Sequence, residues 1–118
     1  MKLKGICIHT NNVPRLVDFY STVLCVPAEG DDIYTVLDEV NLAIWNPGAI
    51  DEHKSKTSER FVTLMFEVED VDKEYERLKQ LDMQIEFISQ PTTQPWGSRA
   101  FGFKDPDGNN VDFLSLIS

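Results

Sequence analysis

Cysteines and long hydrophobic runs are both scarce in this chain of 118 residues. The two cysteines, Cys7 and Cys25, fall in an expected strand and at an expected helix end, and nothing else suggests a disulfide-stapled scaffold. Two reduced thiols are therefore the simpler interpretation, and a disulfide is the alternative. No apolar run approaches the roughly 20 residues that span a bilayer. The chain also turns polar at His9, before a signal-peptide core could form, so we expect a cytoplasmic protein.

Basic residues are few as well. Eleven Lys and Arg stand against 20 Asp and Glu, which gives a formal net charge of −9. A field of that sign repels phosphate backbones and anionic lipid surfaces, so we expect neither nucleic acid nor a membrane as a partner. The same field modestly favours a cationic ligand, and a role in solubility is the alternative. The length fits one compact domain and leaves little room for two independent cores.

The first half of the chain shows the pattern of one strand, one helix and two further strands. Asn11-Asn12 supply a helix cap, Pro14 suits the first turn, and the segment 26–30 contains the residues that stop a helix. Apolar residues between them recur at spacings of three and four, which buries one face. That face comprises Val13, Leu16, Val17, Phe19, Tyr20, Val23 and Leu24. The expected strands are Lys4–His9, Ile33–Leu37 and Asn41–Trp45, with a turn at Asp38-Glu39 between the last two.

The same pattern returns after a polar stretch, residues 46–60, which has the composition of an exposed connection. We divide the chain into module one (1–50), a linker (51–60) and module two (61–118). Asp70 is the expected cap of the second helix. The expected strands are Phe61–Val68, Gln84–Ile88, Ser98–Lys104 and Asn110–Leu116, with a loop at Gln90–Pro95 and a hairpin turn at Asp105–Gly108.

An internal duplication explains this recurrence. One shift of 58 residues carries Val13 to Val71 and also Gly5 to Thr63. Two such units imply a pseudo-symmetric arrangement in which each contributes a curved sheet. A neighbouring sheet, from the same chain or from a second one, would close a pocket.

Three motifs carry a resemblance to a known family. They are Val13-Pro14-Arg15 with Asp18-Phe19-Tyr20, then Phe66 to Asp72, then Phe103 to Asn109. Their order and spacing resemble the vicinal oxygen chelate (glyoxalase/bleomycin-resistance/dioxygenase) superfamily over nearly the whole chain. The resemblance implies an α+β fold of two βαβββ modules that form a curved, partly open cup as a single domain, often completed by homodimerisation. Since an open sheet edge is a liability, we expect a homodimer that covers those edges.

The resemblance also implies where a metal would be held. Metal-using members carry ligands at positions that correspond here to Gly5, Thr63, Ala43 and Asp112. Only Asp112 is a good ligand, whereas a site needs three or four donors of nitrogen, oxygen or sulfur type. We therefore expect no metal and no cofactor. The chain is more similar to the branch that includes bleomycin-sequestering proteins, and the stretches 95–99 and 105–109 look similar to that branch.

Strand alternation then predicts which side chains line the cup. If Gly5 and Thr63 face inward, a period of two sends Ile6, Ile8, Leu64, Phe66 and Val68 toward the helices. The resemblance suggests that Ser98, Ala100 and Gly102 face inward, with Phe101 and Phe103 in the core. The candidate ligand-binding residues are Cys7, His9, Trp45, Thr63, Met65, Glu67, Trp96, Ser98 and Asp112.

Each candidate also has a structural interpretation. Trp45 and Met65 also suit a core, His9 a strand end, and Cys7 the role of a small buried hydrophobe. Glu67 is the best candidate for a proton-transfer base, with a hydrogen-bonded structural carboxylate as the alternative. Two further residues are left open. Arg99 either pairs with a carboxylate or reaches the rim, and His53 has the features of a solvated loop residue.

Our leading hypothesis is metal-independent binding of a small cationic or aromatic molecule, for sequestration or sensing. A glyoxalase-type lyase or isomerase, or a dioxygenase-like enzyme with atypical ligands, is the main rival. The third is a dimeric interaction domain without a small-molecule ligand.

Overall fold

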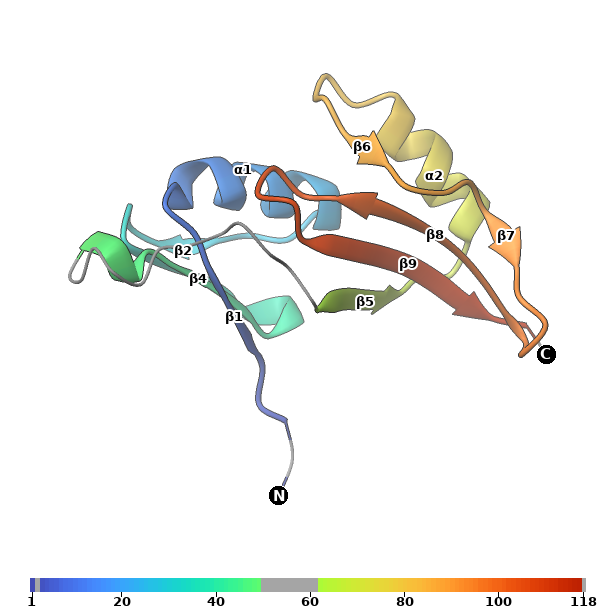
Figure 1. Cartoon of the computed structure of the whole chain (residues 1–118), viewed down its shortest axis with the longest axis horizontal. Helices are drawn as coiled ribbons and strands as arrows, with labels where there is room; N and C mark the ends of the chain where they lie inside the picture. The colour runs from blue at the N-terminus through green and yellow to red at the C-terminus, as the bar shows by residue number, and fades with distance from the viewer. Residues whose placement is uncertain (2, 50–61, 118) are drawn as a thin grey trace. The chain divides into compact units, whose positions relative to one another are not determined.

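The computed structural model describes residues 1, 3–49 and 62–117, and it divides the chain into two compact units (Figure 1). Unit 1 spans Met1–Glu59 and unit 2 spans Arg60–Ser118. Each is a βαβββ-type module with an open, mixed sheet, as predicted. The predicted linker, with His53, lies outside the described residues. No helix in the described ranges is long and apolar enough to cross a membrane.

Unit 1 has four strands in the order β1-β4-β3-β2, and β1 runs parallel to β4 while the other pairs are antiparallel. Its α-helix packs against β3 and β4. The elements are β1 (Ile6–His9), α1 (Val13–Leu24), β2 (Glu29–Gly30), β3 (Tyr34–Leu37), β4 (Leu42–Trp45) and the 3₁₀ helices η1 (Asp38–Val40) and η2 (Pro47–Ala49).

Local chemistry fixes both ends of α1. The Asn12 side chain accepts a hydrogen bond from the Arg15 amide at 3.2 Å, and Pro14 stands in the first turn, where its missing N–H costs nothing. Cys25 ends the helix in the left-handed conformation with φ 56°. The buried face is the predicted one, with Val17 and Leu24 half-buried at its margin. Fully buried are Val13, Leu16, Phe19, Tyr20 and Val23.

Unit 2 has the order β5-β9-β8-β6, with β7 also paired to β8. The Asp70 side chain caps α2 by accepting from the Lys73 amide at 3.0 Å, as predicted. Phe101, Phe103 and Phe113 form the buried aromatic core between this helix and its sheet. The elements are β5 (Thr63–Glu67), α2 (Val71–Lys79), β6 (Glu86–Phe87), β7 (Thr92–Thr93), β8 (Ser98–Lys104) and β9 (Asn110–Leu116).

The hairpin between β8 and β9 is closed by one buried carboxylate. Asp105, 5% exposed, accepts hydrogen bonds from the amides of Asp107 at 2.9 Å and Asn109 at 2.8 Å, and from the Asn109 side chain at 2.6 Å. Gly108 takes φ 91°, which favours glycine. The turn predicted from Asp-Pro-Asp-Gly is therefore confirmed, and it fixes the register of the two longest strands.

Several predicted boundaries were wrong. The strand predicted from Lys4 begins at Ile6, because its partner ladder starts there, where the Ile6 amide donates to the Asn41 carbonyl at 3.0 Å. Asp38-Glu39 lie in η1 rather than in a simple turn, and Pro47 is buried although we expected an exposed connection. The predicted strand Gln84–Ile88 shrinks to β6. Two short strands, β2 and β7, were missed, the latter inside the predicted loop.

Candidate ligand-binding faces

Each sheet has one face that packs against the α-helix of its own unit, and we call the opposite face the open face. The predicted alternation holds in both first strands. Ile8 and Leu64 are buried on the helix side, whereas Cys7, His9 and Met65 lie on the open faces, where Met65 is 66% exposed. Ile6 is the exception, with 36% exposure at the start of its strand.

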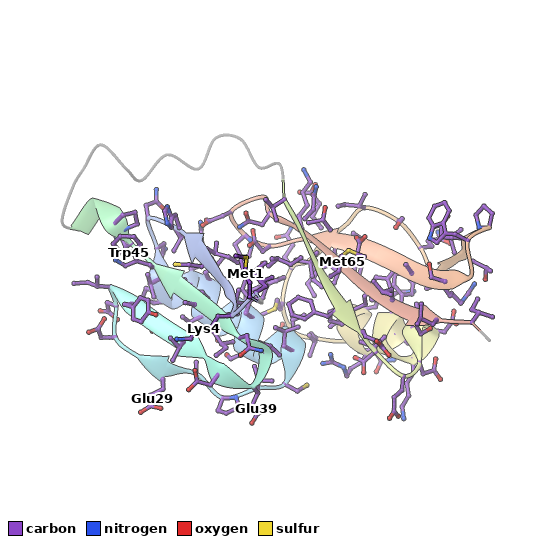
Figure 2. All side chains as sticks on the ribbon, turned by 90° about the horizontal axis from the view of Figure 1, so that it is seen from below. Met1, Lys4, Glu29, Glu39, Trp45 and Met65 are labelled. Atoms are coloured by element: carbon purple, nitrogen blue, oxygen red, sulfur yellow. The ribbon has the colours of Figure 1, made fainter. Side chains whose placement is uncertain are left out.

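The open face of unit 1 ends in an aromatic row. Strand register aligns His9, Trp45 and Tyr34 on three neighbouring strands. The rings of His9 and Trp45 meet edge to face, with centroids 5.2 Å apart and planes at 87°. Tyr34 is 49% exposed, and Figure 2 labels Trp45 on this sheet. Such a row provides aromatic surface against which a planar molecule can stack.

Beside this row the face is hollowed, with a volume of about 360 Å³. The next register row, Cys7, Ala43 and Val36, has small or short side chains that leave this space. The walls of the hollow also carry the polar residues Lys4, Asp38 and Asn41. Burial raises the pKa of the Cys7 thiol, which keeps that thiol neutral. The lining consists of Lys4, Gly5, Ile6, Cys7, Tyr34, Val36, Asp38, Asn41, Leu42 and Ala43.

Gly5 belongs to this hollow because only glycine fits there. A Cβ atom at residue 5 would lie 2.5 Å from the Asn41 carbonyl oxygen. Real Cβ atoms do not come so close to another heavy atom. The Asn41 carbonyl is held in place by the hydrogen bond from the Ile6 amide. Any ligand-bearing side chain at this position would require the backbone to move.

The open face of unit 2 is organised around Asp112. This residue stands in register with Met65 on β5 and with Gly102 on β8. Its Oδ1 atom lies 2.8 Å from where a Cβ of Gly102 would be, so the carboxylate occupies space that glycine leaves free. Burial raises the pKa of Asp112. No hydrogen bond or ion pair to this carboxylate occurs within the described parts of the chain.

The other predicted site residues of unit 2 are more scattered. Thr63 and Glu67 share the open face and are exposed, and Glu67 stands opposite Leu114 rather than beside Asp112. Ser98 is buried at the far end of β8, opposite Leu116. Trp96 lies in the connection between β7 and β8 and is 76% exposed. The structure therefore brings Thr63, Met65, Glu67 and Asp112 onto one face but leaves Trp96 apart from them.

Arg99 has a partner on the helix side. Its guanidinium donates from Nε and Nη2 to both carboxylate oxygens of Asp72, each at 2.8 Å, and from Nη1 to Thr93 at 2.9 Å. This hydrogen-bonded ion pair lowers the pKa of Asp72. Of the two alternatives left by the sequence, pairing with a carboxylate is therefore the observed one, and Arg99 ties α2 to β8.

The residues at the implied metal positions do not fit a metal ion. Gly5 has no room for a side chain, Ala43 offers a methyl group, and Thr63 a neutral hydroxyl, which leaves Asp112 alone. Over residues 1, 3–49 and 62–117, no group of three or more His, Cys, Asp or Glu side chains could hold an ion.

Sequence reasoning missed several residues of these faces, among them Lys4 and Asp38 in the lining of the hollow. Tyr34 and Val36 follow from the pairing of β3 with β4, so the register of that hairpin, once known, would have placed them beside Trp45 and Ala43. Asn41 lines the hollow through its left-handed backbone, φ 55°, which alternation does not reveal.

Residues 2–113 match the sequence profile of the Glyoxalase/Bleomycin resistance protein/Dioxygenase superfamily. The chain belongs to this superfamily. Among curated relatives, this chain is similar to the uncharacterized protein YraH of Bacillus subtilis (strain 168), with 29% identity over an alignment 131 positions long that covers 99% of this chain and all of that protein.

Solved structures agree with the superfamily fold. A glyoxalase/bleomycin resistance protein/dioxygenase from Nocardioides is 25% identical, with a TM-score of 0.78, and the match covers 100% of this chain and 85% of that one. A family enzyme from Burkholderia phytofirmans PsJN is 18% identical, with a TM-score of 0.82 and coverage of 99% and 100%. The likeness to the second structure shows the fold alone, because fold does not determine function.

Proposed function

We propose that this superfamily member binds a small planar organic molecule without a metal, as a cytoplasmic protein of the bleomycin-resistance-like branch that sequesters or senses its ligand. One observation carries the proposal. The two unit 1 positions at which the resemblance implies metal ligands, Gly5 and Ala43, instead line a hollow of about 360 Å³. Neither residue supplies a donor atom, because Gly5 has no room for a side chain and Ala43 carries only a methyl group, and the volume of the hollow is that of a small-molecule site.

The chemistry around the hollow defines the ligand class. The aromatic row of His9, Trp45 and Tyr34 favours a flat apolar body. A positive charge on the ligand is favoured by the net charge of −9 and by the attraction of a tryptophan face for cations, whereas Asp38 and Lys4 in the lining offset each other. A planar organic cation satisfies all of these features.

A second candidate is a lyase or isomerase that transfers a proton without a metal. The observation that favours it is Asp112, whose pKa burial raises toward the range useful to a general base. Glu67, the base that the sequence favoured, is exposed. If chemistry occurs, we infer that Asp112 is the better candidate.

The test is a thermal-shift titration with three matched probes: the planar cation 9-aminoacridine, neutral acridine, and the anion 9-anthracenecarboxylate. A ligand that binds only the native state raises the melting temperature. We expect the cation to give the largest shift and the anion none. Ala43→Leu, which fills the hollow, should weaken the apparent affinity obtained from the titration by about tenfold. Ala28→Leu, at an exposed site outside the hollow, should leave that affinity unchanged.

Labelling of a thiol supplies a readout that does not depend on stability. In a Cys25→Ser background, alkylation reports on Cys7 alone, and bound 9-aminoacridine should slow it because Cys7 lines the hollow. Equal shifts with Ala43→Leu and wild type, or unprotected Cys7 at saturating probe, would overturn the proposal. So would purified protein that carries a stoichiometric transition metal.

A further inference from the structure

A second hollow lies on the helix side of the unit 1 sheet, between α1 and the edge strand β2 (Figure 1). Its volume is about 370 Å³, and we call it the α1–β2 groove. Thr35, buried on the helix side of β3, lines this groove, whereas its neighbours Tyr34 and Val36 line the hollow of the open face. Among the described residues, the two sites share the sheet but no lining residue.

The groove is elongated. Pro14 and Ser21 both line it from α1, and the seven residues between these positions correspond to about 10 Å along a helix. On the β2 side the lining residues Ala28 and Gly30 fill little space. A Cβ atom at Gly30 would collide with the Tyr34 carbonyl oxygen, so no side chain can fill the groove from that position. The shape therefore suits an extended ligand.

Three carboxylates line the groove, Asp18 on α1 and Asp31 and Asp32 between β2 and β3. Among the described residues, the lining contains no Lys or Arg, and these carboxylates form no ion pair. The Asp31 Oδ1 atom accepts hydrogen bonds from the amides of Ile33 at 2.8 Å and Tyr34 at 3.0 Å. These bonds lower the pKa of Asp31 and keep it ionised. The groove therefore carries negative charge that the described chain does not neutralise.

A buried hydroxyl supplies an observation that does not depend on charge. Thr35 is 4% exposed and lines the groove. Its hydroxyl donates to the Asp31 carbonyl at 2.8 Å, and no described residue donates to the hydroxyl oxygen in return. That oxygen lies 2.7 Å from where a Cβ of Gly30 would be, on the side of the groove that glycine leaves open. An N–H donor in the groove would satisfy this acceptor.

We propose that the α1–β2 groove binds a linear aliphatic polyamine. Ammonium groups pair with the three carboxylates and donate to the Thr35 hydroxyl, while the methylene segments pack on Pro14 and Val17. A metal ion fits less well, because no group of three or more His, Cys, Asp or Glu side chains in the described ranges could hold one. This ligand is flexible and aliphatic, unlike the planar molecule proposed for the hollow of the open face.

Calorimetric titration with spermidine tests the proposal. Wild type should bind one equivalent per chain. Butylamine should bind about tenfold more weakly or worse, because one ammonium group pairs with one carboxylate only. The affinity for spermidine should fall about fivefold when sodium chloride rises from about 50 to about 200 mM, because the carboxylates are exposed and salt screens them.

Two alanine substitutions separate this site from the hollow of the open face. Ala28→Leu narrows the groove at an exposed position without a change of charge, and should weaken spermidine binding by about tenfold. Ala43→Leu should leave spermidine binding unchanged, since Ala43 lines the other hollow. The planar cation 9-aminoacridine should show the reverse pattern. Loss of spermidine binding alone would overturn this inference, and loss of 9-aminoacridine binding alone would overturn the proposed function.

A pair of double variants tests the carboxylates at equal net charge. Asp18→Asn with Asp32→Asn removes two carboxylates from the groove and should weaken spermidine binding by about tenfold. Asp82→Asn with Glu86→Gln changes two exposed residues of unit 2 and also takes the net charge from −9 to −7. This control should weaken binding by less than about twofold. Equal effects of the two double variants, or full affinity in Ala28→Leu, would mean that the acidic surface as a whole attracts spermidine, and would overturn the proposal.

Discussion

At the residue scale, Asp112 is the side chain that the fold explains least. A half-buried carboxylate without a partner among the described residues contributes no hydrogen bond to the sheet, and burial raises its pKa. A carboxyl whose folded pKa exceeds its ordinary value costs nothing while it is protonated. The loss of folding stability appears as pH rises from the ordinary pKa of the unfolded chain to the raised pKa of the folded protein, and it persists at higher pH. A residue kept at such a cost is a candidate for function.

Asp112→Asn should therefore stabilise the protein at neutral pH, by roughly 0.5 kcal/mol because solvent screens a half-exposed carboxylate. The gain should vanish below the ordinary pKa of aspartate. Denaturant unfolding at several pH values measures it.

The control variant, Asp72→Asn, should change stability in the opposite direction. Arg99 lowers the pKa of Asp72, so the stability from that pair is present above the ordinary aspartate pKa and is lost as pH falls through the lowered one. Asp72→Asn should therefore destabilise the protein at neutral pH. If Asp112→Asn destabilises the protein as Asp72→Asn does, desolvation does not govern Asp112.

Alternation predicted the open faces correctly at this scale, because a period of two fixes the side of a strand without knowledge of its neighbours. It could not find the pairing of Arg99 with Asp72, since 27 residues separate them. Nor could it show that Gly5 lies against the Asn41 carbonyl, a contact set by the left-handed backbone at Asn41.

At the scale of elements, the predictions succeeded where a local signal exists. Residues close together in sequence determine the helix caps at Asn12 and Asp70 and the turn from Asp105 to Gly108. The two-residue strands β2 and β7 have no periodicity to read, because they exist only through pairing with β3 and β8. Their absence from the prediction reflects long-range pairing rather than weak propensity.

The β8–β9 turn yields a prediction about its carboxylate. Asp105→Ala removes the acceptor of three hydrogen bonds at a site that is 5% exposed. The backbone amides of Asp107 and Asn109 and the side-chain amide of Asn109 then lose this acceptor. We expect a loss of about 3 kcal/mol in the free energy of unfolding. Chemical denaturation measures it.

Asp82→Ala, at an exposed position in a different loop, is the control and should change stability by less than about 0.5 kcal/mol. An Asp105→Ala variant as stable as that control would mean that water replaces the turn's hydrogen bonds without loss.

At the scale of the whole chain, the duplication is regular only in part. Cys7 and Met65, at equivalent places in the two sheets, differ by 58 residues, as the sequence predicted, but their partners Ala43 and Asp112 differ by 69. The second module therefore has 11 additional residues between the start of its helix and its last strand. The extra segment contains β7 and the connection in which Trp96 lies.

Net charge acts on the chain as a whole. With 20 acidic and 11 basic residues, compaction brings like charges together, and screening them should favour the folded state. We expect sodium chloride to raise the melting temperature by roughly 2–5 °C. Chloride is preferred to sulfate, which strengthens apolar burial regardless of charge.

Glu39→Lys is the control variant. It changes an exposed residue of η1 and reduces the net charge from −9 to −7, so its melting temperature should rise less with salt. A melting temperature that falls with salt would show instead that ion pairs such as Arg99–Asp72 outweigh the general repulsion.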